Sequence, residues 1–121
     1  MIMVTKKRIP ELFKSIDSKN MEGFLSFLDE GVFFRFGNMP GIQGRDNVET
    51  AIRGFYDSIA GLSHELDEIF GEESILACNG TVTYTRLDTS KLSVPFATVF
   101  KLNGDRIKEY NIYVDISELY K

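Results

Sequence analysis

The order of sequence patterns predicts a single α+β domain in which helices come first and antiparallel strands follow. Two observations support this prediction. The first half of the chain repeats apolar residues at helical spacing, whereas the second half contains runs rich in Val, Thr, Tyr and Phe, with Asn-Gly dipeptides between some of them. A length of 121 residues suffices for one core but not for two ordinary domains. We therefore expect one domain over residues 1–121.

The opening third predicts two helices that meet at a tight corner. The first apolar stripe comprises Ile9, Leu12, Phe13 and Ile16, and after a break over residues 17–20 the second comprises Phe24, Leu25, Phe27 and Leu28. A β-rich run over residues 32–36 then predicts a short strand, which ends in the turn-prone segment 37–41.

A long amphipathic helix is predicted from Gly44 to about Leu62, because its apolar residues recur at intervals of four, three and four: Val48, Ile52, Phe55 and Ile59. A meander of strands follows. We expect strands over residues 64–70, 74–78, 81–88, 92–102 and 106–115, with turns at Asn79-Gly80 and Asn103-Gly104.

Strand parity indicates which side chains face inward, because alternate residues of a strand point to opposite faces. Val82, Tyr84, Arg86 and Asp88 share one face of the 81–88 strand, and Tyr110, Ile112 and Val114 share the more apolar face of the last strand. If the helices cover the face that carries Val82 and Tyr84, Arg86 and Asp88 are drawn into the interior with them. The sequence thus predicts polar groups inside an apolar hollow.

Composition excludes several function classes. The net charge is −4 and no basic run exceeds Lys6-Lys7-Arg8, so we expect no nucleic-acid surface. One His and one Cys form no metal-ligand cluster, and no Gly-rich phosphate loop occurs, so we expect neither a metal nor a cofactor. No stretch approaches the roughly 20 apolar residues of a membrane span. A lone Cys78 fits a reducing compartment, and we expect a cytoplasmic protein.

The order of these elements, together with the segments RFGNMPGIQGRDNVETAI, YTRLD and RIKEYNIYVDISELY, resembles the SnoaL-like branch of the nuclear transport factor 2-like superfamily. The pattern is most similar to limonene epoxide hydrolase-like and uncharacterised SnoaL-like members. The resemblance covers nearly the whole chain. It implies a cone-shaped α+β barrel, in which N-terminal helices pack on a strongly curved, mostly antiparallel sheet around a deep pocket, and it implies a homodimer.

The same resemblance assigns roles to individual residues. The epoxide hydrolases carry an Arg-x-Asp pair on a central strand, which Arg86 and Asp88 match; the Asp protonates the epoxide oxygen. Asn38 matches a water-holding Asn, but Phe36 replaces the Tyr that accompanies it, and Ile112 replaces the second, water-activating Asp. Because isoleucine can neither give nor take a proton, epoxide hydrolysis is not expected.

Ketosteroid isomerases of the superfamily place an Asp general base where this chain has Asn38, and a neutral amide cannot take a proton from carbon. Other interpretations stay open for each candidate. Arg86 and Asp88 could be a structural ion pair, Tyr84 a core residue, and Asn38 the residue that sets a turn. His64, the only histidine, is expected to be a surface or capping residue near the mouth of the cone.

The leading hypothesis is a pocket that binds a small, mainly apolar organic ligand. Its catalytic candidates are Asp88 as proton donor, Arg86 as its partner and Tyr84 as a hydrogen-bond donor. Its ligand-binding candidates are Phe36, Asn38, Tyr56, Phe96, Tyr110 and Ile112. Chemistry there would be that of a cofactor-independent isomerase, cyclase or hydrolase-like enzyme. The alternative is a non-catalytic binding or assembly protein whose threonine-rich sheet exterior docks a second copy.

Overall fold

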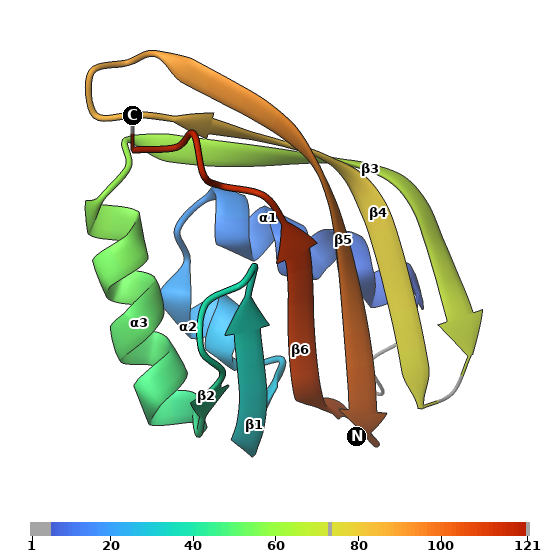
Figure 1. Cartoon of the computed structure of the whole chain (residues 1–121). Helices are drawn as coiled ribbons and strands as arrows, with labels where there is room; N and C mark the ends of the chain where they lie inside the picture. The colour runs from blue at the N-terminus through green and yellow to red at the C-terminus, as the bar shows by residue number, and fades with distance from the viewer. Residues whose placement is uncertain (1–5, 73, 121) are drawn as a thin grey trace.

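The computed structural model describes residues 6–72 and 74–120 and has one curved sheet that bends around the helices (Figure 1). Its six strands lie in the order β2-β1-β6-β5-β4-β3 and pair antiparallel, except that β1 and β6 are parallel. The elements in chain order are a 3-10 turn (Lys6–Arg8), α1 (Ile9–Asp17), α2 (Met21–Leu25), β1 (Leu28–Phe36), β2 (Ile42–Gln43), α3 (Arg45–Asp57), β3 (Gly61–Glu72), β4 (Ile75–Thr85), β5 (Lys91–Asn103) and β6 (Arg106–Val114). The α+β prediction and the mostly antiparallel sheet are confirmed.

The corner between α1 and α2 is built by local backbone chemistry. Lys19 adopts a left-handed φ of 56°, which stops α1. The side chain of Asn20 then accepts a hydrogen bond from the backbone N–H of Gly23 at 3.1 Å and so caps α2. The two helices therefore turn tightly, as predicted, and α1 lies across the concave face of the sheet (Figure 1).

Two predicted helices are too long. α2 ends at Leu25, and Leu28 already belongs to β1, where it pairs with Ile107 of β6. α3 ends at Asp57, and β3 begins at Gly61, four residues beyond that end. In both places apolar spacing fitted a helix, but pairing with a neighbouring strand satisfies the backbone groups instead.

The turn predicted at Asn79-Gly80 is wrong, because β4 runs without interruption through both residues. A bulge lies opposite them in β3, between Leu66 and Glu68. The Asn79 amide oxygen accepts the backbone N–H of Glu68 at 3.1 Å, and a Cβ on Gly80 would collide with the carbonyl oxygen of Glu65. The Asn-Gly pair therefore permits a close approach of two strands inside the sheet. The other predicted turn is present but lies one residue later, at Gly104-Asp105, because Asn103 is the last residue of β5 and pairs with Arg106.

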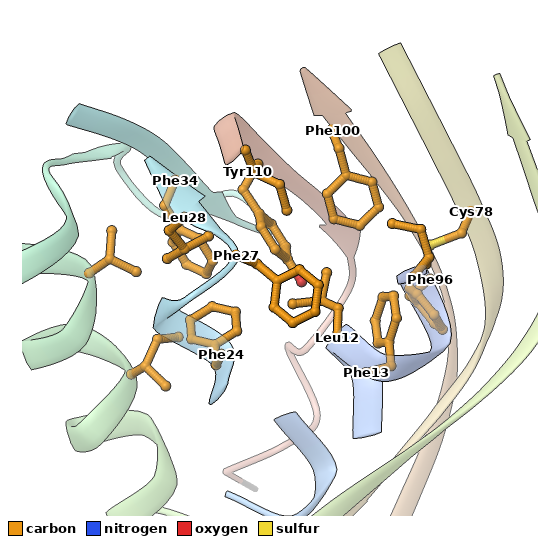
Figure 2. Packing of buried hydrophobic residues seen from close by; sticks show 14 of the residues in the cluster. Leu12, Phe13, Phe24, Phe27, Leu28, Phe34, Cys78, Phe96, Phe100 and Tyr110 are labelled. Carbon is orange, nitrogen blue, oxygen red and sulfur yellow. The ribbon is translucent and has the colours of Figure 1, made fainter. Parts of the chain in front are cut away.

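The core lies between the helices and the concave face of the sheet and contains many aromatic side chains. Figure 2 shows Tyr110 of β6 among Phe24, Phe34 and Phe100, with ring centroids between 4.9 and 6.0 Å from that of Tyr110. Phe13 of α1 lies beside Phe96 of β5, with ring centroids 5.7 Å apart. Such edge and tilted contacts fix the rings relative to one another, and they leave a hollow next to the core.

Candidate functional site

An interior cavity lies between α1, α3 and the concave face of the sheet. It offers about 50 Å³ in which the centre of a water-sized sphere fits. Its walls are formed by Phe13, Ile16, Phe24, Phe34, Phe36, Ile52, Phe55, Tyr56, Leu62, His64, Val82, Tyr84, Phe96, Thr98, Tyr110 and Ile112. The wall of the cavity is almost entirely apolar, so its few polar groups are the candidates for hydrogen bonds to a ligand.

Three tyrosines contribute hydroxyl groups to this wall. The Tyr56 hydroxyl donates to the carbonyl of Ile16 at 3.0 Å, and burial, followed by the charge of Asp17, raises the pKa of Tyr56 to about 12. Burial raises the pKa values of Tyr84 and Tyr110 as well. Within the described residues, the Tyr84 hydroxyl has no hydrogen-bond partner. These hydroxyls stay protonated near neutral pH, so they can act as hydrogen-bond donors.

A carboxylate and an imidazole meet at one end of the cavity. Asp17 Oδ1 lies 2.5 Å from Nδ1 of His64, and Asp17 Oδ2 accepts the backbone N–H of His64 at 2.8 Å. The side chain of His64 is 10% exposed and that of Asp17 is 25% exposed. Phe13 and Phe96 cover the imidazole ring, at centroid distances of 4.8 and 5.1 Å. The pair is thus fixed by two hydrogen bonds and two ring contacts.

Helical geometry explains how α1 supplies part of this arrangement. Phe13 and Asp17 are four residues apart and therefore lie on the same face of the helix, so that one contacts the His64 ring and the other binds its nitrogen. Asp17 is the last residue of α1, where the helix dipole disfavours a carboxylate. The two hydrogen bonds to His64 offset that cost. A locally unfavourable residue held by tertiary contacts is typical of a functional position.

The hydrogen bond to Asp17 also fixes the chemistry of the imidazole. In the neutral ring, Nδ1–H donates to the carboxylate, which leaves Nε2 as the nitrogen with a free lone pair. His64 also borders an open groove between α1 and β3 that Asp17, Lys14 and Glu65 line. The imidazole therefore lies between an apolar cavity and a groove that is open to solvent.

Most of the ligand-binding candidates do surround the cavity. Phe36, Tyr56, Phe96, Tyr110 and Ile112 all line it, and so does the catalytic candidate Tyr84. Strand parity had indicated the inward direction of Tyr84, Tyr110 and Ile112, each of which lies within a regular strand, whereas Tyr56 lies on α3. Asn38 does not join them: it is exposed in the turn that follows β1.

The expectation that Arg86 and Asp88 face the hollow is wrong. β4 ends at Thr85, and Asp88 is exposed in the turn before β5, where it accepts hydrogen bonds from the backbone and hydroxyl of Ser90 at 2.9 and 2.6 Å. These bonds, and then Arg86, lower the pKa of Asp88. Side chains alternate between the two faces of a sheet only within a strand, and β4 ends before Arg86 and Asp88.

Arg86 has a structural environment of its own. Its guanidinium donates to the carbonyls of Leu119 and Glu118, each at 2.9 Å, and to the Ser90 hydroxyl at 3.1 Å. Arg86 therefore fastens the segment after β6 to the β4–β5 turn.

Sequence reasoning missed Asp17 and undervalued His64. Asp17 was counted as part of the break after the first helix, and His64 was expected at the surface. One signal was present. The only histidine lies two positions from Leu62 and two positions from Leu66, so the three side chains share the apolar face of an amphipathic strand. The pairing of residues 47 positions apart had no signal in a single sequence.

Two further findings concern metal ions and membranes. Within residues 6–72 and 74–120, no three or more His, Cys, Asp or Glu side chains gather in a way that could hold a metal ion. None of the helices in that described part of the chain has the length and apolar character needed to cross a membrane.

Comparisons with solved structures agree with this fold. An NTF2-like protein of unknown function from Burkholderia pseudomallei K96243 is 18% identical with a TM-score of 0.85, over 96% of this chain and 95% of that one. TerC, co-crystallized with polyporic acid, is 13% identical with a TM-score of 0.82, over 94% and 93%. An LEH-like epoxide hydrolase of M. tuberculosis is 12% identical with a TM-score of 0.79, over 94% and 84%. At such identities the likeness shows the fold alone.

Sequence comparisons give the family. No curated protein matches the sequence. The family model described as a SnoaL-like domain matches residues 9–110, which is most of the chain. This range contains α1, His64 and every residue of the cavity wall except Ile112. The chain belongs to the SnoaL-like domain family and has the NTF2-like cone fold.

Proposed function

We propose that this protein binds a small, mainly apolar organic molecule that carries a carbonyl group, and that it moves a proton on that molecule. His64 is the proton acceptor and donor, and Asp17 orients its ring. The observation that supports this most directly is the Asp17–His64 pair at the end of an otherwise apolar cavity. A polar pair of this kind in an apolar pocket is the arrangement that general acid–base catalysis needs.

The proton transfer can be written for a carbonyl compound. Nε2 of His64 takes a proton from the carbon next to the carbonyl; the C–H electrons form a carbon–carbon double bond, and the carbonyl π electrons move to oxygen. Asp17 stabilises the imidazolium that results. The Tyr84 hydroxyl, held protonated by burial, donates a hydrogen bond to the enolate oxygen. Return of the proton to the same or another carbon completes an exchange or an isomerisation.

The family supports an organic ligand. SnoaL-like domains bind small organic molecules, and the TerC structure was obtained with polyporic acid. Neither likeness names the ligand of this chain. The aromatic wall favours a ligand with rings or alkyl groups, since burial of apolar surface provides most of the binding free energy.

Exchange of carbon-bound hydrogen tests the proposal without knowledge of the natural substrate. We expect the protein to accelerate the exchange of the α-hydrogens of 2-butanone for deuterium in D₂O, followed by proton NMR. His64→Gln should reduce the rate to that of buffer, because glutamine cannot accept the proton. Equal rates for the wild type and His64→Gln, with both proteins folded by circular dichroism, would contradict the assignment.

A homodimer through the sheet exterior is a second proposal, independent of the chemistry. The exterior carries exposed Thr81 and Ser93, a hydrogen bond between the Thr83 and Ser93 hydroxyls at 2.8 Å, and Tyr113 with 55% of its surface exposed. Sedimentation equilibrium tests it: Tyr113→Arg should shift the protein toward the monomer if this face is the interface.

A further inference from the structure

A second apolar hollow lies directly outside the cavity. It is a groove between α3, the loop that joins β1 to β2, and the segment after β6, and it encloses about 330 Å³. The residues specific to the groove include Met39, Pro40, Ile42, Ala51, Ile116 and Tyr120. Met39 is 56% exposed and Tyr120 is 62% exposed, and both border the groove together with other apolar side chains.

The groove and the cavity share part of their walls. Phe34, Phe36, Ile52 and Phe55 line both. Phe36 and Phe55 meet edge to face with ring centroids 5.0 Å apart, and Phe55 meets Tyr84 in the same way at 5.9 Å. These rings form a partition between the two spaces. Rotation of one Phe ring about its side-chain bonds would connect them.

The outer wall of the groove is held in place from two sides. We call residues 115–120 the C-terminal strap; in Figure 1 it turns back from β6 toward the C-terminal end of α3. Arg86 binds the carbonyls of Glu118 and Leu119. At the other side, the Tyr120 hydroxyl lies 2.8 Å from the Ser58 hydroxyl, which itself donates to the carbonyl of Phe55 at 2.7 Å. The strap thus spans from the β4–β5 turn to α3.

The two volumes differ in what they can hold. The cavity, at about 50 Å³, accommodates a reacting group of a few atoms, whereas ligand pockets typically enclose about 300–1,000 Å³. The groove is of that larger size. Tyr84 and Tyr120 lie close enough that the Tyr120 hydroxyl contributes, after burial, to the raised pKa of Tyr84. Tyr84 lines the cavity and Tyr120 lines the groove.

We propose that the groove is the outer half of one ligand site. The carbonyl end of an elongated molecule enters the cavity next to His64, its alkyl or ring body lies in the groove against Met39 and Tyr120, and the Phe36–Phe55 partition opens to admit it. This inference rests on the proposed function, because it takes the cavity as the place of the reacting group. It adds the substrate class: carbonyl compounds with an apolar body of several carbons.

A series of methyl ketones from 2-butanone to 2-octanone tests the groove. The signal is the imidazole Hε1 resonance of His64, which is unambiguous because the chain has one histidine. We expect the dissociation constant obtained from its shift to fall about two- to fourfold for each added methylene, since each buried CH₂ favours binding by up to about 0.8 kcal/mol. A dissociation constant that does not change with chain length would overturn the groove proposal.

Gly54→Leu is the variant that fills the groove. A Cβ at Gly54 meets no atom within 4 Å, and leucine is a better helix former than glycine, so this variant should fold. We expect it to abolish most of the gain in affinity from 2-butanone to 2-octanone. Arg53→Leu is the matched control: it places the same side chain at an exposed position of α3 that does not line the groove, and the gain should persist. Equal gains in both variants would refute the proposal.

The two proposals fail differently. Chain-length-dependent binding without deuterium exchange would leave the groove in place and remove the catalytic role of His64. Deuterium exchange into 2-butanone, with a dissociation constant that does not vary with ketone length, would support the catalytic role of His64 and remove the groove. If Gly54→Leu instead lowers the fraction of dimer in sedimentation equilibrium and leaves the ketone affinities unchanged, the groove is a subunit contact and not a ligand site.

Discussion

Two regions of this molecule each bring a basic side chain and a carboxylate together, and they differ in almost everything else. In the β4–β5 turn, Arg86 and Asp88 are two residues apart in the sequence, but Asp88 is exposed and bound to Ser90. At the α1–β3 contact, His64 and Asp17 are 47 residues apart, yet they form a direct hydrogen bond beside the cavity. The first pair can be recognised in the sequence because its residues are close together. The second pair forms beside the cavity only because α1 packs on β3.

The difference teaches that a short motif is informative only within the element that carries it. Arg86-x-Asp88 would share the face of Tyr84 if the strand continued, but the strand ends one residue earlier. The turn frees both side chains for other bonds. His64 is the fourth residue of β3, so its direction is fixed by the sheet.

The largest expected difference between the two regions is in activity. Asp17→Asn removes the charge that orients His64 and stabilises the imidazolium, and we expect the deuterium-exchange rate to fall by about 10²-fold or more. Asp88→Asn should leave that rate within a factor of two. A large loss of rate in Asp88→Asn, together with the wild-type rate in Asp17→Asn, would place the catalytic carboxylate in the β4–β5 turn and not at the α1–β3 contact. Unfolding in urea provides the control for stability.

The bulge beside His64 offers a second way to break the α1–β3 contact. Gly80→Ala places a methyl group against the carbonyl oxygen of Glu65, the residue after His64. Because backbone atoms must move, we expect the free energy of unfolding to fall by about 2–4 kcal/mol. Gly54→Ala is the matched control, since its Cβ meets open space in the middle of α3, and it should stabilise the fold by about 0.5–1 kcal/mol. Equal effects of the two changes would show that β3 adapts without strain.

The tyrosines of the cavity wall and the β4–β5 turn affect stability in opposite directions as the pH changes. Tyr56 has a folded pKa of about 12 against an ordinary value of 10.0, so between these values the folded state holds a proton that the unfolded chain has lost. Stability is therefore fully present below about pH 10 and falls as the pH rises toward 12. Tyr84 and Tyr110, also raised by burial, act in the same sense. Asp88 has a lowered pKa, so its contribution is lost as the pH falls.

Urea unfolding at a series of pH values, combined with tyrosine absorbance at 295 nm, measures this dependence. Tyr56→Phe removes one titrating group, so between pH 10 and 12 the free energy of unfolding should decrease less steeply with pH than in the wild type. An unchanged slope in that variant would mean that Tyr56 ionises equally in the folded and unfolded states.

The smallest expected effect concerns the role of Arg86. Arg86→Met keeps the aliphatic stem but removes the bonds to Glu118 and Leu119, and we expect a loss of about 1 kcal/mol in stability. Amide hydrogen exchange should rise within the C-terminal strap and remain unchanged in α1. The deuterium exchange of 2-butanone should change little, because Arg86 does not line the cavity. Unaltered amide exchange in the strap would refute this structural role.

The sequence predicted the fold well wherever periodicity was long and regular. β5 and β6 lie close to their predicted bounds, and α1 contains the whole predicted apolar stripe from Ile9 to Ile16, because each has a consistent apolar face. The β5–β6 hairpin turns at Gly104-Asp105, one residue after the predicted Asn103-Gly104, and Gly104 has a φ of 63°. Asn79-Gly80 has the same two residues but lies within β4. The dipeptide alone could not distinguish a turn from a close approach of two strands.

The sequence by itself determined the α+β class, the position of the helices ahead of most of the strands and several aromatic residues of the cavity wall, because these follow from local spacing and from the alternation of side chains along strands. Only the tertiary structure decided which polar groups meet the cavity. The end of β4 at Thr85 turned Asp88 outward, and the packing of α1 on β3 brought Asp17 to His64. Such contacts depend on where strands end and how layers pack, and no repeat in a single sequence encodes them.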